Sequence, residues 1–223
     1  YIRLHQRAAD WYRRENEDDE AFHHYLAAEC IDDALNIVQR THSAYYKQGN
    51  IETLLSWRSA LGEHATRLPQ FVHTCAMILT DRYLYSDAMA ELDSAEAGFM
   101  VQEDPAWVAE VGLQRAMIHI RRADYRAARE IVTPISRDTS LKETTVGRAK
   151  HLLALIELAV GDFGKAINLL EQIRPLFERT NDAFYVSGVL QDLAIAYARG
   201  GNMASASHSL QRLVALRRTL GQS

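Results

Sequence analysis

The chain has 223 residues, of which 48% are hydrophobic and 24% charged, and only 11 Gly and 4 Pro interrupt it. This composition excludes a disordered or collagen-like chain, as well as a β-sandwich or barrel that needs many turns. The formal net charge of −4 predicts that this chain does not bind nucleic acid directly, because such binding requires clustered basic side chains.

The two cysteines, Cys30 and Cys75, are too few and too far apart for a disulfide framework or a zinc site. We expect both to be buried thiols in a reducing compartment, which favours the cytoplasm. No stretch of apolar residues is long enough to span a membrane. The chain opens on Tyr1 within a helical pattern, without an initiator Met or a signal peptide. We therefore expect it to be a piece of a larger protein.

Helical periodicity runs through almost the whole chain, starting at its N-terminal end. The pattern predicts helices over 2–15, 19–28, 31–47 and 51–61, with turns around Asn16 and Gly49. These first helices follow a loose plan, so we interpret residues 1–62 as a helical linker with irregular repeats. A regular array, residues 63–223, follows and begins near Leu68-Pro69.

The regular array contains a repeat that is marked by alanines. The anchor alanines Ala88, Ala128, Ala166 and Ala206 are spaced by 40, 38 and 40 residues, and an aromatic residue or Met stands three positions before each. Twelve residues before each anchor stands another alanine: Ala76, Ala116, Ala154 and Ala194. Two antiparallel helices approach closely only where side chains are small. The spacing therefore predicts four helical hairpins, the last over 183–199 and 204–220, each crossing at an alanine pair.

Further positions of the repeat have a structural interpretation. Asp124, Asp162 and Asn202 lie in the turns, where the second helix of a hairpin needs an N-cap. The aliphatic residues four places after the anchors, Leu92, Val132, Leu170 and Leu210, are expected to face the next repeat. The pattern is similar to the tetratricopeptide repeat (TPR), whose period is about 34. It predicts an all-α fold of TPR-like helical hairpins that form a right-handed superhelix, an α-solenoid.

Short sequence motifs in the N-terminal region resemble those of one known family. They are Leu4-His5, Ala8-Ala9, Trp11-Tyr12, Glu20-Ala21, His24 and Leu26-Ala27-Ala28, followed by residues 49–57, Ala60-Leu61 and Leu68-Pro69. In this order they are similar to MalT-like transcription activators of the LuxR family, which belong to the STAND class of signal-transduction ATPases. The resemblance covers essentially the whole chain.

The resemblance implies the TPR-like sensor domain of a large cytoplasmic bacterial regulator. In that family an N-terminal NTPase domain precedes the sensor and a LuxR-type helix-turn-helix follows it. Those two domains would be partners of this chain, and ATP would bind in the missing NTPase domain. The implied role is to bind a small-molecule or protein effector and so control self-association of the full-length protein on promoter DNA.

The chain itself shows no catalytic, cofactor or metal motif. Residues 161–166, Gly-Asp-Phe-Gly-Lys-Ala, have the wrong spacing for a phosphate-binding loop and end in Ala instead of Ser or Thr. There is no G-x-S-x-G and no H-E-x-x-H. His23 and His24 are adjacent, so on a helix they point about 100° apart and do not share one metal ion. We therefore predict that this chain is not an enzyme and that it holds no metal.

The candidate binding surface is the inner wall of the predicted superhelix. In TPR arrays ligands usually lie against the first helix of each hairpin. Mapped onto this repeat, that face carries the candidate ligand-binding residues His73, Glu110, Met117, Arg148, His151 and Gln191. Such a wall of polar and apolar groups suits a small polar ligand or an extended peptide. Tyr83 and Trp107 could stack on a ligand, but packing at the hairpin ends is the simpler interpretation.

Two functions from different classes follow from these observations. The first is the effector-sensing, regulatory domain of a LuxR-type transcription regulator. The alternative is a standalone TPR-like scaffold that binds a peptide or partner protein. A third class, an all-α enzyme, has no catalytic constellation to support it.

Overall fold

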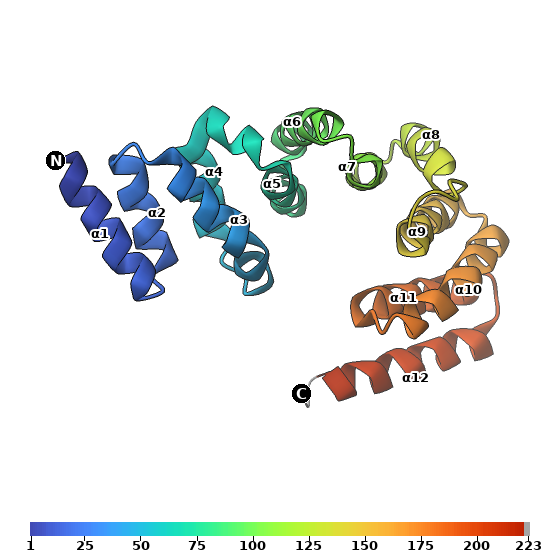
Figure 1. Cartoon of the computed structure of the whole chain (residues 1–223). Helices are drawn as coiled ribbons and strands as arrows, with labels where there is room; N and C mark the ends of the chain where they lie inside the picture. The colour runs from blue at the N-terminus through green and yellow to red at the C-terminus, as the bar shows by residue number, and fades with distance from the viewer. Residues whose placement is uncertain (221–223) are drawn as a thin grey trace. The chain divides into compact units, whose positions relative to one another are not determined.

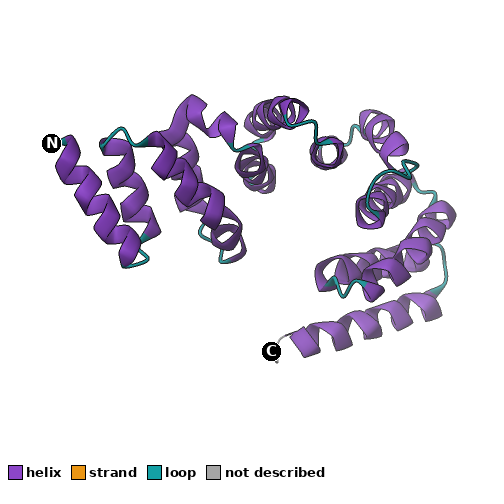
Figure 2. Ribbon diagram, in the orientation of Figure 1, coloured by secondary structure: helices purple, strands orange, loops and turns teal. Residues whose placement is uncertain are grey.

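The computed structural model describes residues 1–220, and every regular element in that range is helical. Twelve α-helices and one 3₁₀ helix follow one another, with no strand among these residues (Figures 1 and 2). The predicted all-α class of helical hairpins is therefore confirmed. The handedness of the predicted superhelix stays a prediction.

The chain folds as two compact units, Tyr1–Val111 and Gly112–Ser223, and the division falls inside helix α7 (Pro105–Arg121). The domain boundary predicted at residue 62 rests on a different criterion, the onset of a regular repeat, and it stays a prediction. At that point the structure places a short 3₁₀ helix, η1 (Gly62–Arg67), between two α-helices.

The first unit holds six complete α-helices, η1 and the start of α7. The α-helices are α1 (Ile2–Arg14), α2 (Asp18–Ala27), α3 (Ile31–Lys47), α4 (Ile51–Leu61), α5 (Pro69–Asp81) and α6 (Tyr85–Val101). Helix α1 packs on α2, α2 packs on α3, and α5 packs on α6. The helices predicted over 31–47 and 51–61 have the predicted bounds, and α1 and α2 differ from prediction by one residue at their ends.

A buried tryptophan organises the irregular part of the first unit. Trp57 of α4 is fully buried, and its indole N–H donates a hydrogen bond to Asp19 Oδ1 of α2 at 2.7 Å. The Phe22 and Tyr45 rings lie 5.1 and 4.9 Å from it, centroid to centroid. A buried indole N–H requires such an acceptor, so this bond joins α2 to α4 while α3 contributes the third ring.

The second unit continues α7 and adds five helices. They are α8 (Tyr125–Ile135), α9 (Glu143–Val160), α10 (Phe163–Arg179), α11 (Ala183–Arg199) and α12 (Met203–Leu220). Side chains of α7, α8 and α9 share one apolar cluster, and α10, α11 and α12 share the next together with Ala154 of α9.

The alanines that mark the repeat lie in the core, and the register of the repeat stays a prediction. All eight alanines that the spacing selects are buried: Ala76, Ala88, Ala116, Ala128, Ala154, Ala166, Ala194 and Ala206. Three of the four aliphatic positions, Leu92, Val132 and Leu170, are fully buried. The fourth was expected to face a next repeat, but Leu210 is 49% exposed, because no described helix covers that side of α12.

The predicted N-caps are confirmed as well. The side chains of Asp124, Asp162 and Asn202 accept hydrogen bonds from backbone N–H groups three residues later, at 3.1 to 3.2 Å. Before each of these caps the chain turns through a left-handed residue: Ala123 (φ 59°), Gly161 (φ 88°) and Gly201 (φ 85°). Glycine adopts this conformation without strain.

Two further expectations concern the cysteines and the membrane. Cys75 is buried as expected, and burial raises the pKa of its thiol. Cys30 is only half-buried, because it lies in the short connection between α2 and α3; neither cysteine forms a disulfide. None of the helices in the described range is both long and apolar enough to cross a bilayer.

The alanine crossings give a first prediction. Replacing Ala154 or Ala194 with Leu should overpack a helix crossing and lower the free energy of unfolding by about 1–3 kcal/mol. Urea unfolding followed by circular dichroism measures the loss. The control is Ala198→Leu, which adds the same side chain at an exposed position of α11. Unfolding midpoints equal to that of the parent in both core variants would show that the register is wrong.

Candidate functional site

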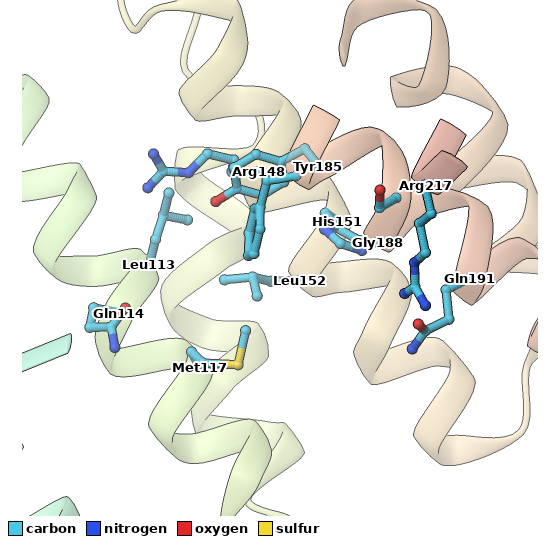
Figure 3. Close-up of a pocket in the computed structure, with 12 residues that line it drawn as sticks. Leu113, Gln114, Met117, Arg148, His151, Leu152, Tyr185, Gly188, Gln191 and Arg217 are labelled. Carbon is cyan, nitrogen blue, oxygen red and sulfur yellow. The ribbon is translucent and has the colours of Figure 1, made fainter. Parts of the chain in front are cut away.

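The second unit contains a pocket on the first helices of its hairpins, with a volume of 390 Å³ (Figure 3). Helices α7, α9 and α11 supply most of its wall, and α12 adds one arginine. The lining residues are Leu113, Gln114, Met117, Arg148, His151, Leu152, Phe184, Tyr185, Ser187, Gly188, Gln191 and Arg217. A pocket of this size is within the range of small-ligand and side-chain sites.

The amphipathic pattern of α11 explains why its residues line the pocket. One face of the helix, including Val189, Leu190 and Leu193, is buried against α10 and α12. Phe184, Gly188 and Gln191 are spaced by four and three residues, so they share the opposite face and border the pocket. The helix thus packs with one face and borders the pocket with the other.

Two helix glycines differ in what surrounds them. A Cβ at Gly147 of α9 would lie 2.7 Å from Leu176 Cδ2 of α10, so a larger residue there would require the Leu176 side chain to shift. A Cβ at Gly188 of α11 would lie 3.4 Å from His151 Cε1, which is an ordinary contact. The absent side chain at Gly188 therefore leaves the pocket open beside His151.

Arg148 and Tyr185 pack against each other in the wall of the pocket. The guanidinium carbon of Arg148 lies 5.7 Å from the centroid of the Tyr185 ring, within the range of a cation–π interaction. On its other side the Tyr185 ring stacks on Phe177, with centroids 4.8 Å apart and planes inclined by 17°. Burial raises the pKa of Tyr185, against a smaller opposing effect of the Arg148 charge. The phenol therefore stays neutral near pH 7.

His151 is held by a carboxylate. Its Nε2 atom lies 2.7 Å from Asp192 Oδ2 of α11, and both side chains are largely buried, with exposed fractions of 12% and 14%. This bond joins α9 to α11 and fixes the orientation of the imidazole, whose Cε1 faces Gly188. His151 thus contributes a positioned ring to the wall of the pocket.

The ionic groups of the lining are positive. Arg148 and Arg217 line the pocket, and the twelve lining residues include neither Asp nor Glu. Figure 3 shows the two guanidinium groups at opposite ends of the row of lining side chains, with Leu152 and His151 between them. Arg217 lies on the same side of this view as Gln191.

The structure brings four of the six predicted ligand-binding residues together. Met117, Arg148, His151 and Gln191 all line this pocket. The other two belong to the first unit: His73 of α5 is buried with its ring edge-to-face against Trp107, and Glu110 of α7 is half-buried. The part that any of the six plays in binding stays a prediction.

The two aromatic residues weighed in the sequence have different positions. Trp107 packs against the α5–α6 hairpin, stacked on Phe99 with centroids 5.0 Å apart and planes inclined by 7°. Tyr83 lies in the α5–α6 turn and is 74% exposed, so it does not pack there as expected. Its backbone has a left-handed φ of 63°, which turns the chain at that point.

Sequence reasoning missed several lining residues. Phe184, Ser187 and Gly188 precede Gln191 on the same face of α11, and the four-residue spacing was a signal for Phe184 and Gly188. Arg217 lies on a second helix, which the first-helix rule does not select. Asp192, the partner of His151, gave no signal in the sequence. Within residues 1–220 no group of three or more His, Cys, Asp or Glu side chains could hold a metal ion.

Comparisons with known proteins match the fold alone. No protein-family model matches the chain, and no curated protein does. Among solved structures it is similar to a tetratricopeptide repeat protein from Parabacteroides merdae, with a TM-score of 0.64 and 16% identity over 96% of this chain and 79% of that one. It is also similar to BtubC (BKLC) from P. vanneervenii, with a TM-score of 0.58 and 16% identity over 100% and 91% of the two chains.

At this identity the likeness concerns the fold. The chain has the TPR-like helical architecture that the alanine repeat predicted. Proteins of this architecture generally use it to hold other molecules, and the fold supplies the surface without dictating the ligand.

Proposed function

We propose that this chain is a TPR-like binding module that holds an extended peptide segment of a partner protein. The pocket on α7, α9 and α11 supports this proposal most directly, because the face of α11 that borders it is opposite the face that packs on α10 and α12. The function needs no catalytic group, and the pocket lining supplies side chains that suit recognition.

An extended ligand fits the surface better than a compact one. Phe184 stands at the edge of the pocket with 80% of its surface exposed, and Ile195 is 40% exposed further along the same face of α11. From Phe184 to Ile195 this face measures about 16 Å, at 1.5 Å per residue. A compact ligand in the pocket would leave both side chains in water, whereas a peptide lying along α11 would cover them.

The side chains also match what a peptide presents. Leu113, Met117 and Leu152 supply an apolar surface for one side chain of the peptide. Gln114 and Gln191 carry carboxamides, which both donate and accept hydrogen bonds and can therefore pair with peptide N–H and C=O groups. A small number of well-positioned polar groups on mostly apolar walls is typical of such recognition sites.

Filling the pocket tests this function. We expect the Gly188→Leu variant to bind a fluorescein-labelled pool of degenerate hexapeptides at least about 10-fold more weakly than the parent, because the added side chain occupies the space beside His151. Fluorescence anisotropy with the whole 223-residue chain measures the affinities.

The matched control is Gly164→Leu, which adds the same side chain on α10, where a Cβ contacts only Asp162. It should bind the pool as the parent does. Thermal unfolding confirms that each variant is folded, and Gly188→Ala offers a milder filling if the Leu variant does not fold. Unchanged binding by a folded Gly188→Leu variant would place the ligand elsewhere.

A second candidate function rests on the N-terminal sequence motifs, from Leu4-His5 to Leu68-Pro69, which resemble those of MalT-like activators. In this proposal the chain is the cytoplasmic sensor domain of a LuxR-type regulator, and the same pocket takes an effector. The effector would favour an ATP-bound, self-associating form of the longer protein. It can shift that equilibrium only by its difference in affinity for the two states.

The coding sequence around this segment tests the second candidate. We expect G-x-x-x-x-G-K-S/T, a phosphate-binding loop, on its N-terminal side and a basic helix-turn-helix on its C-terminal side. An open reading frame that encodes neither motif would contradict the regulator proposal and leave the peptide-binding proposal standing.

A further inference from the structure

The pocket in the second unit borders a cluster of aromatic rings, and this cluster narrows the class of ligand. We propose that the peptide bound there inserts an aromatic side chain into the pocket, in preference to an aliphatic side chain of the same shape. The inference rests on the proposed peptide-binding function and adds the chemistry of the anchoring residue. Its basis is that three of the lining residues described, His151, Phe184 and Tyr185, carry rings, and a fourth, Met117, carries a thioether.

Tyr185 lies at the centre of the cluster. Phe177 stacks on its ring, and the Arg148 guanidinium carbon lies 5.7 Å from the ring centroid on the other side. The rings of Phe184 and His151 meet Tyr185 at steep angles, with planes inclined by 88° and 73° and centroids 5.3 and 6.2 Å away. Because its two faces are occupied, Tyr185 offers the pocket a ring edge. The edge of an aromatic ring is its positive side, which attracts the negative face of another ring.

His151 presents a second ring edge, and the orientation of this ring is fixed. Its Nε2 atom lies 2.7 Å from Asp192 Oδ2, and a Cβ at Gly188 would lie 3.4 Å from its Cε1 atom. A side chain that enters the space beside Gly188 therefore meets the Cε1 edge of the imidazole. An aromatic side chain has a π face to place against this edge, whereas a saturated one has none.

Met117 adds a group that also favours an aromatic partner. Its side chain packs against the apolar cluster that includes Leu113 and Leu152, and all three line the pocket (Figure 3). A thioether sulfur is polarizable and makes favourable contacts with aromatic rings at about 5 Å. The two leucines accept an aliphatic anchor as readily as an aromatic one. The discrimination therefore comes from Met117 and the rings.

Phe184 contributes an exposed ring at the edge of the pocket. It lies in the first turn of α11, and 80% of its surface is exposed. An aromatic anchor beside it would remove apolar surface of both side chains from water and add the interaction between the two rings. An aliphatic anchor would gain the first of these contributions and not the second.

The size of the pocket suits one side chain of a longer ligand. Its volume of 390 Å³ is near the lower end of the range for small-ligand sites, about 300–1,000 Å³. A free aromatic molecule would fill this space too. It would not cover Ile195, which is 40% exposed further along α11, and a peptide anchored in the pocket would. The surface thus favours an aromatic residue within a peptide.

Two peptide pools that differ in the saturation of one ring test the inference. Both are acetylated, amidated, fluorescein-labelled hexapeptides with one fixed position, which is Phe in one pool and cyclohexylalanine in the other, and with no aromatic residue elsewhere. The two side chains have nearly the same shape, and the saturated one is the more hydrophobic. We expect the whole 223-residue chain to bind the Phe pool about 3- to 10-fold more tightly, as measured by fluorescence anisotropy.

Two methionines provide a matched control for the site. Met117→Leu removes the sulfur from the pocket wall and should reduce the preference for the Phe pool about 2-fold, and Phe184→Leu should reduce it by a similar factor. Met203→Leu makes the same change as Met117→Leu at an exposed position of α12 that does not line the pocket. It should leave the preference unchanged. The quantity compared is the ratio of two affinities of one variant, so a general loss of active protein cancels.

The outcomes separate the two proposals. Equal binding of the two pools, or tighter binding of the cyclohexylalanine pool, would overturn the aromatic-anchor inference. If Gly188→Leu abolishes that binding, the peptide-binding function still stands. No binding of either pool would overturn both proposals. A preference that Met117→Leu and Phe184→Leu both leave unchanged would contradict an anchor at these residues. Displacement of the Phe pool by N-acetylphenylalaninamide at the concentration of the hexapeptides would show that the ligand is a free aromatic molecule and would also overturn the inference.

Discussion

The close crossing of two helices at a pair of alanines is the constraint on which the rest of this structure depends. Each of the four hairpins from α5 to α12 has an alanine on both helices at the same register, and all eight side chains are buried. A larger residue would separate the helices and shift every contact beyond the crossing. Because the crossing recurs about every 40 residues, each hairpin presents a similar apolar surface to the next, as in other repeat architectures.

The two helices of a hairpin therefore differ in role, and in the second unit the first helix of each hairpin borders the pocket. Within the second unit the first helices, α7, α9 and α11, border a common pocket, to which the packing residues Leu113 and Leu152 also contribute. Gly147 leaves room for the Leu176 side chain of α10, and Gly188 leaves space beside His151. The His151–Asp192 bond then fixes α9 against α11 at the pocket itself, so the wall is positioned before any ligand arrives.

The fold and part of the candidate site could be predicted from the sequence, because the features that determine them act locally. Small residues and N-caps act locally, so their spacing predicted the hairpins and the four residues Met117, Arg148, His151 and Gln191 that share one pocket. Arg217 and Asp192 could not be predicted, because their roles depend on how helices of different repeats approach one another. His73 and Glu110 occupy matching repeat positions, yet they belong to the first unit, and repeat register alone does not show where one compact unit ends.

The central claim is that a ligand lies against the first helices and not the second. Photo-crosslinking measures this directly: p-benzoylphenylalanine replaces Ser187 of α11, which lines the pocket, or Asn168 of α10, which is exposed outside it. After irradiation with a biotinylated degenerate hexapeptide pool, our account predicts biotin on the chain substituted at Ser187 and little on the chain substituted at Asn168. Equal labelling of the two, or labelling at Asn168 alone, would contradict it.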